Sequence, residues 1–260
     1  NSLRLGASKT YTLPQAKEIS PYRYVGVNFN SQGNPNLKPS DHYNLDLKWD
    51  FNPTPTELIS LTAFYKLIKN PISRIEVASA GGYLSYENIA DKATVAGVEI
   101  EIRKNLFVRP VSNAAHGMNK LSLGLNGSYI YTNAKMPLAT VTTGSQLEGA
   151  APWIVNFDLS HNFTKGERSF VNTLVLNYVS DKIYTIGTQG YQDVMEQGVL
   201  ILDFVSQAKL NKHLSLNLKA RNLLNPSYKL SRKANENGEK VILNDYKKGI
   251  NISLGVSCTF

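Results

Sequence analysis

Side chains that could carry out acid–base or metal chemistry are thinly spread along this sequence. The four histidines are His42, His116, His161 and His213. They lack the His-x-Glu or His-x₃-His spacing that brings two metal ligands together. Glu99 and Glu101 share one face of a predicted strand with Arg103, and such a group is more often a charge network than a catalytic pair. The sequence also lacks a glycine-rich phosphate loop, a nucleophile elbow and an HExxH motif. We therefore predict no catalytic residues, no metal site and no cofactor.

A long polar segment at 11–41 groups side chains that could bind a ligand. The candidates are Tyr22, Arg23, Tyr24 and Asn28. Aromatic rings beside a guanidinium and an amide suit stacking on sugars or catecholate-like rings, and Arg23 could pair with an anion. The alternative is that the tyrosines pack this loop against its neighbours, which is the more common role. Tyr191 and Gln192, in a second polar segment at 187–197, are weaker candidates.

The elements that must position these side chains show a regular alternation of apolar and polar residues. In 42–51 the apolar set is Tyr43, Leu45, Leu47, Trp49 and Phe51, and the last ten residues, NISLGVSCTF, alternate in the same way. A period of two indicates β-strands with one apolar face. We predict an all-β chain of about ten strands, at about 2–10, 42–51, 57–77, 83–104, 119–132, 152–163, 169–186, 198–210, 213–232 and 240–260. The segment 107–120 departs from this scheme, because a connection expected to be short is long there.

Composition limits the partners. The chain has 260 residues and a formal net charge of +8, but its lysines and arginines are scattered and form no basic helix or stripe, so we expect no nucleic-acid partner. The single cysteine, Cys258, excludes an intrachain disulfide and a cysteine-rich zinc site. No apolar run approaches the roughly 18 residues of a membrane-spanning helix, whereas membrane-spanning strands give a weaker signal.

The apolar strand faces could meet either a second sheet or lipid. The predicted strands are longer than the strands of soluble folds, which usually have about five or six residues. About ten residues are enough to span the apolar band of an outer-membrane barrel. The opposite faces are strongly polar, and aromatic residues gather near the strand ends, as the two lipid–water interfaces favour. The residues expected at these interfaces are Trp49, Phe51, Tyr129, Tyr131, Trp153, Phe163 and Phe260. We predict an antiparallel transmembrane β-barrel, with a soluble β-sandwich as the alternative.

Several motifs resemble those of TonB-dependent outer-membrane receptors. They are Gly33-Asn-Pro-Asn-Leu-Lys-Pro39 followed by His42-Tyr-Asn-Leu-Asp-Leu47, Ala63-Phe-Tyr-Lys66 with Asn70-Pro-Ile72, Gly97-Val-Glu-Ile-Glu-Ile-Arg103, and Ala220-Arg-Asn-Leu-Leu-Asn225 with Tyr228. The final strand, which ends at Phe260, is similar to the signal that the barrel-assembly machinery recognises. The order and spacing of the motifs cover essentially the whole chain.

The resemblance implies a larger protein than this chain. Receptors of this family form a barrel of about 22 strands around a plug. Residues 1–260 would be the C-terminal portion of that barrel, and the plug domain and the segment that engages the TonB complex would be absent from this chain. The implied function is active uptake of a metal chelate, cobalamin or a glycan across the outer membrane of a Gram-negative bacterium. The implied partners are outer-membrane lipid, the TonB complex and the remainder of the same barrel, and the sequence leaves open whether a surface lipoprotein also binds. The alternative is an intact small barrel that acts as a porin or an outer-membrane enzyme.

Overall fold

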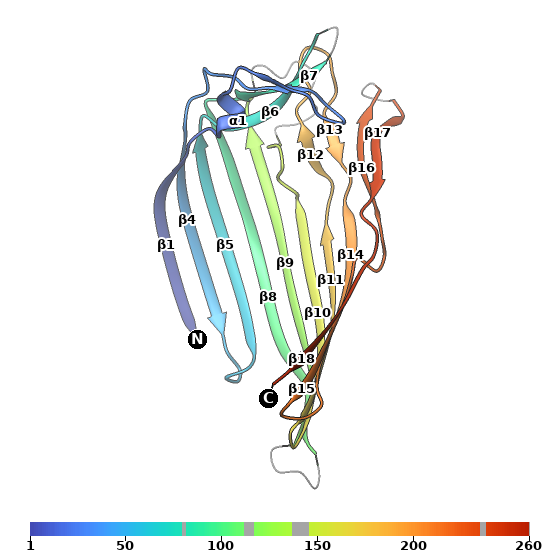
Figure 1. The fold of residues 1–260 in the computed structure, drawn as a ribbon. Helices are drawn as coiled ribbons and strands as arrows, with labels where there is room; N and C mark the ends of the chain where they lie inside the picture. Colours follow the sequence, from blue (N-terminus) through green and yellow to red (C-terminus); the bar gives the residue numbers. More distant parts are fainter. Residues whose placement is uncertain (80–81, 112–116, 137–145, 235–237, 260) are drawn as a thin grey trace.

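A single curved antiparallel sheet forms most of the molecule. The computed structural model describes residues 1–79, 82–111, 117–136, 146–234 and 238–259. Ten strands lie side by side in chain order: β1 (Ser2–Thr12), β4 (Ser40–Phe51), β5 (Leu58–Lys69), β8 (Lys92–Pro110), β9 (Met118–Ala134), β10 (Trp153–Lys165), β11 (Arg168–Val179), β14 (Val199–Lys209), β15 (Leu214–Arg221) and β18 (Asn251–Cys258). β1 and β18 lie at opposite edges of this open sheet, which confirms the all-β antiparallel prediction and shows part of a barrel wall (Figure 1).

Shorter elements gather at one end of the sheet, where the connections are long (Figure 1). One small sheet contains β2 (Arg23–Tyr24), β3 (Ser31–Gln32), β7 (Tyr83–Asn88) and β6 (Ile72–Val77), and a second contains β12 (Lys182–Thr185), β13 (Val194–Glu196), β16 (Ser227–Lys233) and β17 (Lys240–Lys247). The single turn of helix α1 (Ala16–Ile19) lies in the same region. The part of the chain that the structure describes contains no helix with the length and apolar character needed to cross a membrane.

The structure divides five of the predicted strands in two. The predicted strand 57–77, for example, becomes β5 and β6, which belong to different sheets. Asn70 lies between them with a φ of 49°, and Asn222, Asn225 and Gly249 have positive φ at the equivalent breaks near β15 and β18. Asparagine and glycine adopt this left-handed conformation more readily than other residues. The strand predictions ran across these positions although the alternation lapses there: Lys69, Asn70 and Pro71 follow one another, and Asn222 and Asn225 flank two leucines.

The irregular segment at 107–120 arises from an extended hairpin. β8 continues to Pro110 and β9 begins at Met118, with a shift in strand register between Asn105 and Phe107. Such a bulge inserts an extra residue into one strand, here Leu106, which has no partner on β9, and the pairing resumes with Phe107 opposite Leu121. His116 lies outside the described residues.

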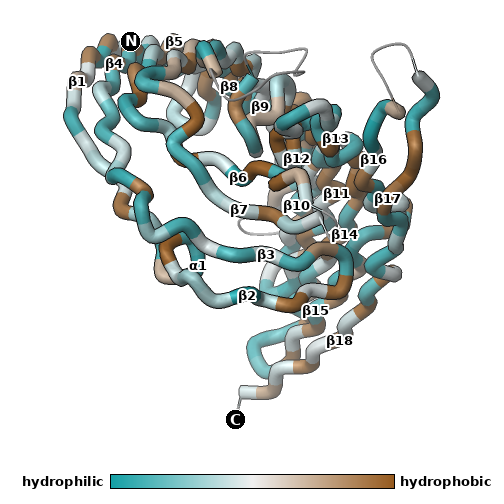
Figure 2. Tube along the Cα trace, turned by 90° about the horizontal axis from the view of Figure 1, so that it is seen from above, coloured by the Kyte–Doolittle hydropathy of each residue, from teal (hydrophilic) through white to brown (hydrophobic). Residues whose placement is uncertain are grey.

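The two faces of the sheet differ in character. Seen from above, the strands follow an arc, and α1, β2, β3, β6 and β7 lie on its concave side (Figure 2). The buried apolar cluster lies beneath these connections and includes Ile75, Ile89, Leu147 and Ile186. Ala93 and Ala134, which are paired across β8 and β9, also belong to this cluster, so their side of the sheet is the inner one. The opposite face exposes apolar side chains that include Leu5, Leu47, Leu61, Val98, Ile100, Leu174, Ile252, Leu254 and Val256.

Gly97 allows an aromatic ring to lie against the inner face of the sheet. It pairs with Phe64 across β5 and β8. A Cβ atom at Gly97 would overlap the Phe64 ring and approach the carbonyl oxygen of Tyr129. Glycine weakens an isolated strand, but here its missing side chain makes room for the ring.

Candidate functional site

The aromatic residues expected at the lipid interfaces lie on the outward face near the strand ends. Tyr129 and Trp153 are paired across β9 and β10 with ring centroids 4.6 Å apart, and Tyr131 is 52% exposed. At the other end of the sheet, the rings of Trp49 and Phe51 stack with centroids 6.2 Å apart. Phe163 packs beside Phe170, with centroids 6.4 Å apart. Phe260 lies outside the described residues. These positions suit two aromatic belts, and their contact with lipid stays a prediction.

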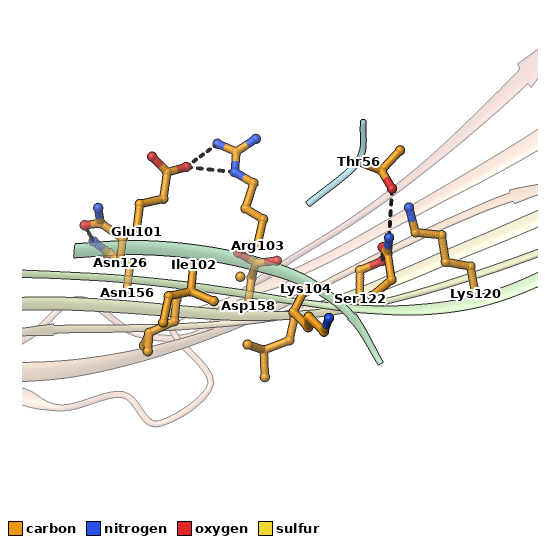
Figure 3. Close-up of a pocket in the computed structure, with 14 residues that line it drawn as sticks. Thr56, Glu101, Ile102, Arg103, Lys104, Lys120, Ser122, Asn126, Asn156 and Asp158 are labelled. Carbon is orange, nitrogen blue, oxygen red and sulfur yellow. Dashed lines mark hydrogen bonds and ion pairs between the residues drawn. The ribbon is translucent and has the colours of Figure 1, made fainter. Parts of the chain in front are cut away.

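The inner face forms a polar wall. Glu101 and Arg103 make the expected charge contact, in which the Arg103 Nη2 and Glu101 Oε1 atoms are 2.7 Å apart. The amide of Asn156 donates to Asn126 Oδ1 (3.3 Å) and accepts from Asn177, so a row of asparagines crosses β9, β10 and β11. Figure 3 shows the first two of these asparagines beside Glu101 and Arg103 around a pocket of about 340 Å³.

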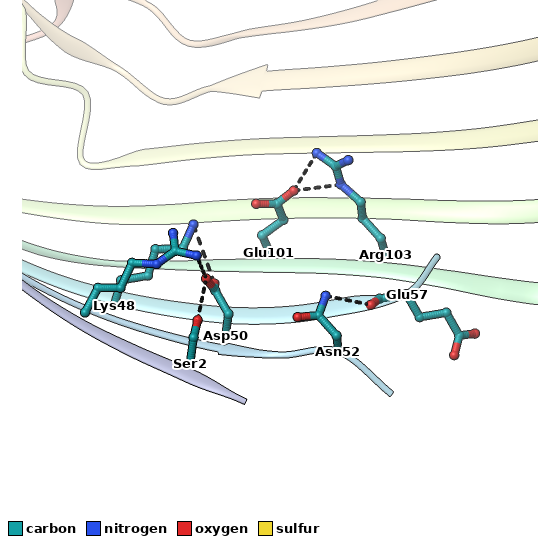
Figure 4. A network of polar contacts seen from close by, with 8 residues as sticks. Ser2, Lys48, Asp50, Asn52, Glu57, Glu101 and Arg103 are labelled. Atoms are coloured by element: carbon teal, nitrogen blue, oxygen red, sulfur yellow. Dashed lines mark hydrogen bonds and ion pairs between the residues drawn. The ribbon is translucent and has the colours of Figure 1, made fainter. Parts of the chain in front are cut away.

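Further polar contacts fix the end of this wall that carries the short turns (Figure 4). Asp50 accepts from Ser2, at 3.4 Å, and forms ion pairs with Arg4 and Lys48 at 3.4 and 3.6 Å. Glu57 lies in the turn before β5 and accepts the backbone N–H of Asn105 at 3.1 Å. That hydrogen bond, opposed by desolvation and aided by Lys104, lowers the pKa of Glu57. These contacts hold neighbouring strands in register and bring no reactive pair together.

Two ion pairs join connections that are far apart in the sequence. On β6, Arg74 Nη2 lies 2.7 Å from Glu148 Oε1, and the Arg74 backbone N–H donates to Glu148 Oε2 at 2.8 Å. The Arg74 guanidinium also lies 4.0 Å from the centre of the Tyr184 ring. Two residues further along β6, Glu76 pairs with Arg232 on β16. β6 thereby links three separate connections at the end of the sheet that carries the long loops.

A cleft of about 290 Å³ lies beside the second ion pair. The residues that line it are Gln146, Asp181, Ile183, Gln192, Asp193, Met195, Ser231, Arg232, Lys233 and Lys240. Asp193 Oδ1 accepts the backbone N–H of Gly187 at 2.8 Å. Burial raises the pKa of Asp193, and the Gly187 hydrogen bond opposes that shift. Three cationic side chains, of Arg232, Lys233 and Lys240, therefore share the cleft with the carboxyl groups of Asp181 and Asp193, and burial makes that of Asp193 easier to protonate.

The four predicted ligand residues lie elsewhere, on the exposed connection between β1 and β4. Tyr22 is 77% exposed, and Asn28 is also exposed. The Arg23 guanidinium lies 5.3 Å from the centre of the Tyr83 ring, and Lys17 Nζ lies 5.6 Å from that of Tyr24. The contacts of Arg23 and Tyr24 suit packing within the loops, the exposure of Tyr22 and Asn28 does not, and ligand binding by this group stays a prediction.

Of the weaker candidates, Gln192 lines the cleft, and Tyr191 lies beneath Arg232, whose guanidinium is 5.3 Å from its ring centre. Sequence reasoning missed Arg74, Asp193 and Arg232. Their spacing carried no signal, because Glu76 and Arg232 are 156 positions apart. Within the described ranges there is no cluster of three or more His, Cys, Asp or Glu side chains suited to a metal ion.

Comparisons with known proteins agree with this architecture. Residues 1–223 match a family model described as "TonB dependent receptor-like, beta-barrel". The iron-regulated outer membrane virulence protein of Vibrio cholerae serotype O1 is 25% identical in strain El Tor Inaba N16961 and 24% identical in strain Classical Ogawa 395, in each case over 208 residues. Each match covers 76% of this chain and 29% of the relative.

Solved structures show the same fold at lower identity. The copper transporter OprC superposes with a TM-score of 0.64 at 14% identity, covering 99% of this chain and 38% of that one. The ferric yersiniabactin uptake receptor FyuA from Yersinia pestis gives a TM-score of 0.60 at 15% identity, covering 99% of this chain and 34% of that one. The chain thus spans well under half the length of these proteins. The match to the family model, over most of an open, amphipathic antiparallel sheet, shows that this chain belongs to the TonB-dependent receptor family of β-barrels in the outer membrane of Gram-negative bacteria.

Proposed function

We propose that this chain forms the C-terminal part of the 22-stranded barrel of a receptor that takes up a metal chelate by TonB-dependent active transport. The observation that carries the proposal is the family match over residues 1–223, which coincides with nine of the ten strands of the open sheet. The plug and the segment that engages TonB belong, in this proposal, to other parts of the full-length protein. The alternative of an intact ten-stranded porin would need β1 to pair with β18, and these strands are opposite edges of the described sheet.

The physics of the bilayer supports a larger barrel. Both β1 and β18 have one edge without a partner in the described sheet, and an unpaired strand edge is costly in lipid because no water satisfies its backbone groups. Further strands of the same protein would pair with these edges and close the wall. The apolar outward face would then contact lipid, and the polar inner face would surround the plug and the route of a hydrated ligand.

The class of ligand is inferred from the cleft and from the relatives. The names of the relatives refer to iron regulation, copper transport and ferric chelates. Lys233 and Lys240 give one side of the cleft a positive charge suited to an anionic chelate with carboxylate or catecholate groups, whereas Arg232 is already paired with Glu76 and Asp181 and Asp193 line the same cleft. A ligand bound there would lie among the long connections, where a plug displaced by TonB could release it inward. The exposed group Tyr22, Arg23, Tyr24 and Asn28 would make outer contacts with the same ligand.

Uptake by cells tests this function. A strain that lacks its own ferric-chelate receptors would express the full-length receptor, and uptake of radiolabelled iron would be measured with a panel of catecholate and carboxylate chelates. We expect accumulation of at least one chelate that disappears when TonB is deleted. Uptake that persists without TonB and extends to small uncharged sugars would instead indicate a porin. In the same assay, Lys233→Gln with Lys240→Gln should weaken uptake more than Arg23→Ala with Tyr24→Ala if the cleft is the main site.

A further inference from the structure

We propose that the outward face of the sheet, at the end with the long connections, binds the phosphate groups of a membrane lipid. Four lysines define this surface, and we call them the rim lysines: Lys9 on β1, Lys69 on β5, Lys92 on β8 and Lys135 just after β9. All four side chains are exposed. Because such barrels carry their longer loops outside the cell, these lysines lie at the outer leaflet of the membrane. The proposal depends on the outer-membrane location and is independent of what the receptor transports.

The strand register places like charges directly opposite one another. Lys69 on β5 pairs with Lys92 on β8. Lys135 follows Ala134, which pairs with Ala93, so a third ammonium group lies at the same height on the next strand. Like charges at directly opposed positions destabilise a sheet. An anion that bridges the ammonium groups would remove this cost, and a phosphate oxygen can accept from several of them.

The rim lysines adjoin the outward aromatic residues. Lys9 and Lys69 lie on either side of Tyr43, with their Nζ atoms 5.4 and 5.3 Å from the ring centre. Tyr65, four residues before Lys69 on the same face of β5, is 46% exposed. At about 3.3 Å per residue, Lys69 therefore lies roughly one headgroup's depth beyond the tyrosine belt. Cations placed just beyond an aromatic belt are well placed to meet lipid phosphates.

A surface groove continues from these cations toward the apolar band. Its volume is about 720 Å³, and its lining includes Tyr65, Leu67, Lys92, Thr94, Asn133 and Lys135. The groove is thus apolar where an acyl chain would lie and cationic or polar where a headgroup would lie. A phosphorylated lipid matches both ends, whereas free phosphate would leave the apolar end unoccupied.

The nearby carboxylates only partly offset the positive charge. Asp41 Oδ1 lies 3.5 Å from Lys9 Nζ and is paired across the strands with Lys69. Asp91 also lines the groove. Four ammonium groups therefore face two carboxylates, and Lys92 and Lys135 lie at the end away from the Lys9–Asp41 pair. This part of the surface is the proposed phosphate contact.

Native mass spectrometry of the full-length receptor in detergent micelles tests the proposal. The probes are bis-phosphorylated lipid A, the same lipid with its phosphates removed, and inorganic phosphate. We expect one bis-phosphorylated lipid to be retained and the dephosphorylated lipid to bind much more weakly. Lys69→Gln with Lys92→Gln should lower the affinity roughly 30-fold, because each lysine near a charged lipid surface contributes a factor of about five.

Matched variants keep the outcome interpretable. Lys165→Gln removes an exposed outward lysine at the opposite end of β10 and should leave binding unchanged. Lys69→Arg with Lys92→Arg keeps both charges and should retain binding, and gel mobility with and without heating confirms that each variant is folded. Equal binding of the two lipids, or equal loss in the Lys165→Gln variant, would overturn the proposal. So would binding of inorganic phosphate as tight as that of the bis-phosphorylated lipid, because the apolar end of the groove would then contribute nothing.

Discussion

Individual ion pairs differ in how much stability should be lost when one partner is removed. Arg74 and Glu148 are largely buried, with side chains 24% and 19% exposed, whereas Lys229 and Asp245 form a more exposed pair at 3.6 Å. Removing one partner of a buried pair leaves the other charge desolvated and unpaired, whereas an exposed pair contributes little.

Glu148→Gln should therefore loosen the connection that precedes β10. We expect about 1–3 kcal/mol less protection of the amides in 146–151, because the Arg74 guanidinium loses its charged acceptor. Hydrogen exchange of the full-length receptor measures this. Asp245→Asn is the control, with an expected loss below about 1 kcal/mol. Equal effects of the two substitutions would contradict a clamping role for Arg74 and Glu148.

The buried carboxyl group of Asp193 should make its loop sensitive to pH. Burial raises the pKa of Asp193 above its ordinary value of 3.8, with the Gly187 N–H opposing the shift. A raised pKa means that Asp193 binds its proton more tightly in the folded loop than in the unfolded loop. Protonation of Asp193 therefore stabilises the loop fully below about pH 3.8, and this stabilisation is lost as the pH rises through the folded-state pKa. Protection of the Gly187 amide against exchange should fall over that interval.

Asp193→Asn should remove this pH dependence. The amide oxygen can still accept from Gly187, and it carries no charge to desolvate. Protection of the Gly187 amide should then stay flat with pH and exceed that of the unchanged receptor at neutral pH. A variant loop that keeps the original pH profile would show that another group titrates.

At the residue scale, the sequence predicted local contacts and missed distant ones. Glu101 and Arg103 are two positions apart on one strand face, so alternation alone placed them together, and they form the expected ion pair. Glu76 and Arg232 come from connections 156 positions apart, and their contact depends on how two small sheets fold over the barrel wall. Tyr22 and Arg23 were chosen by residue type, and the structure places them on an exposed loop.

Among the elements, the strands of the main sheet were predictable and their ends were not. A period of two follows from the geometry of any strand with one apolar face, so it revealed all ten sheet strands. The prediction nevertheless ran one strand through Lys69, Asn70 and Pro71 into β6, although the alternation lapses there and the chain leaves the main sheet. At Asn70 a positive φ marks the end of the strand, whereas no residue between β7 and β8 or between β11 and β12 has one, so no single local feature locates all five breaks.

The contact between Gly97 and Phe64 gives a test at this scale. Gly97→Ala should destabilise the pairing of β5 with β8 by about 1–3 kcal/mol, because the new methyl group overlaps the Phe64 ring and the backbone beneath it. Gly6→Ala is a matched control on the inner face of β1, since an added Cβ there meets nothing within 4 Å. Urea unfolding of the full-length receptor in micelles would compare the two. A larger loss for Gly6→Ala would contradict this account.

Across the whole molecule, the positions of the buried and exposed apolar side chains explain why this sheet would not be stable as a water-soluble fold. The buried apolar cluster lies under the loops at one end, while the outward side chains of the sheet, such as Leu5 and Leu254 at 74% and 71% exposed, have no protein partner in the described structure. Lipid supplies the apolar medium that a second sheet supplies in a sandwich. The sequence predicted this choice from strand length and from the aromatic residues at the strand ends.

The two edges of the open sheet determine whether this chain can close a barrel by itself. The 260-residue chain alone, refolded in detergent, should fail to give the compact, heat-sensitive gel mobility of a closed barrel, because β1 and β18 each leave an edge without a partner in the described sheet. The full-length receptor, refolded in the same way, should give that mobility and lose it on boiling. Adding the separately expressed upstream strands to the chain should restore part of it, since pairing at both edges then becomes possible. A compact, heat-sensitive form of the 260-residue chain alone would contradict the larger barrel and favour a self-contained small one.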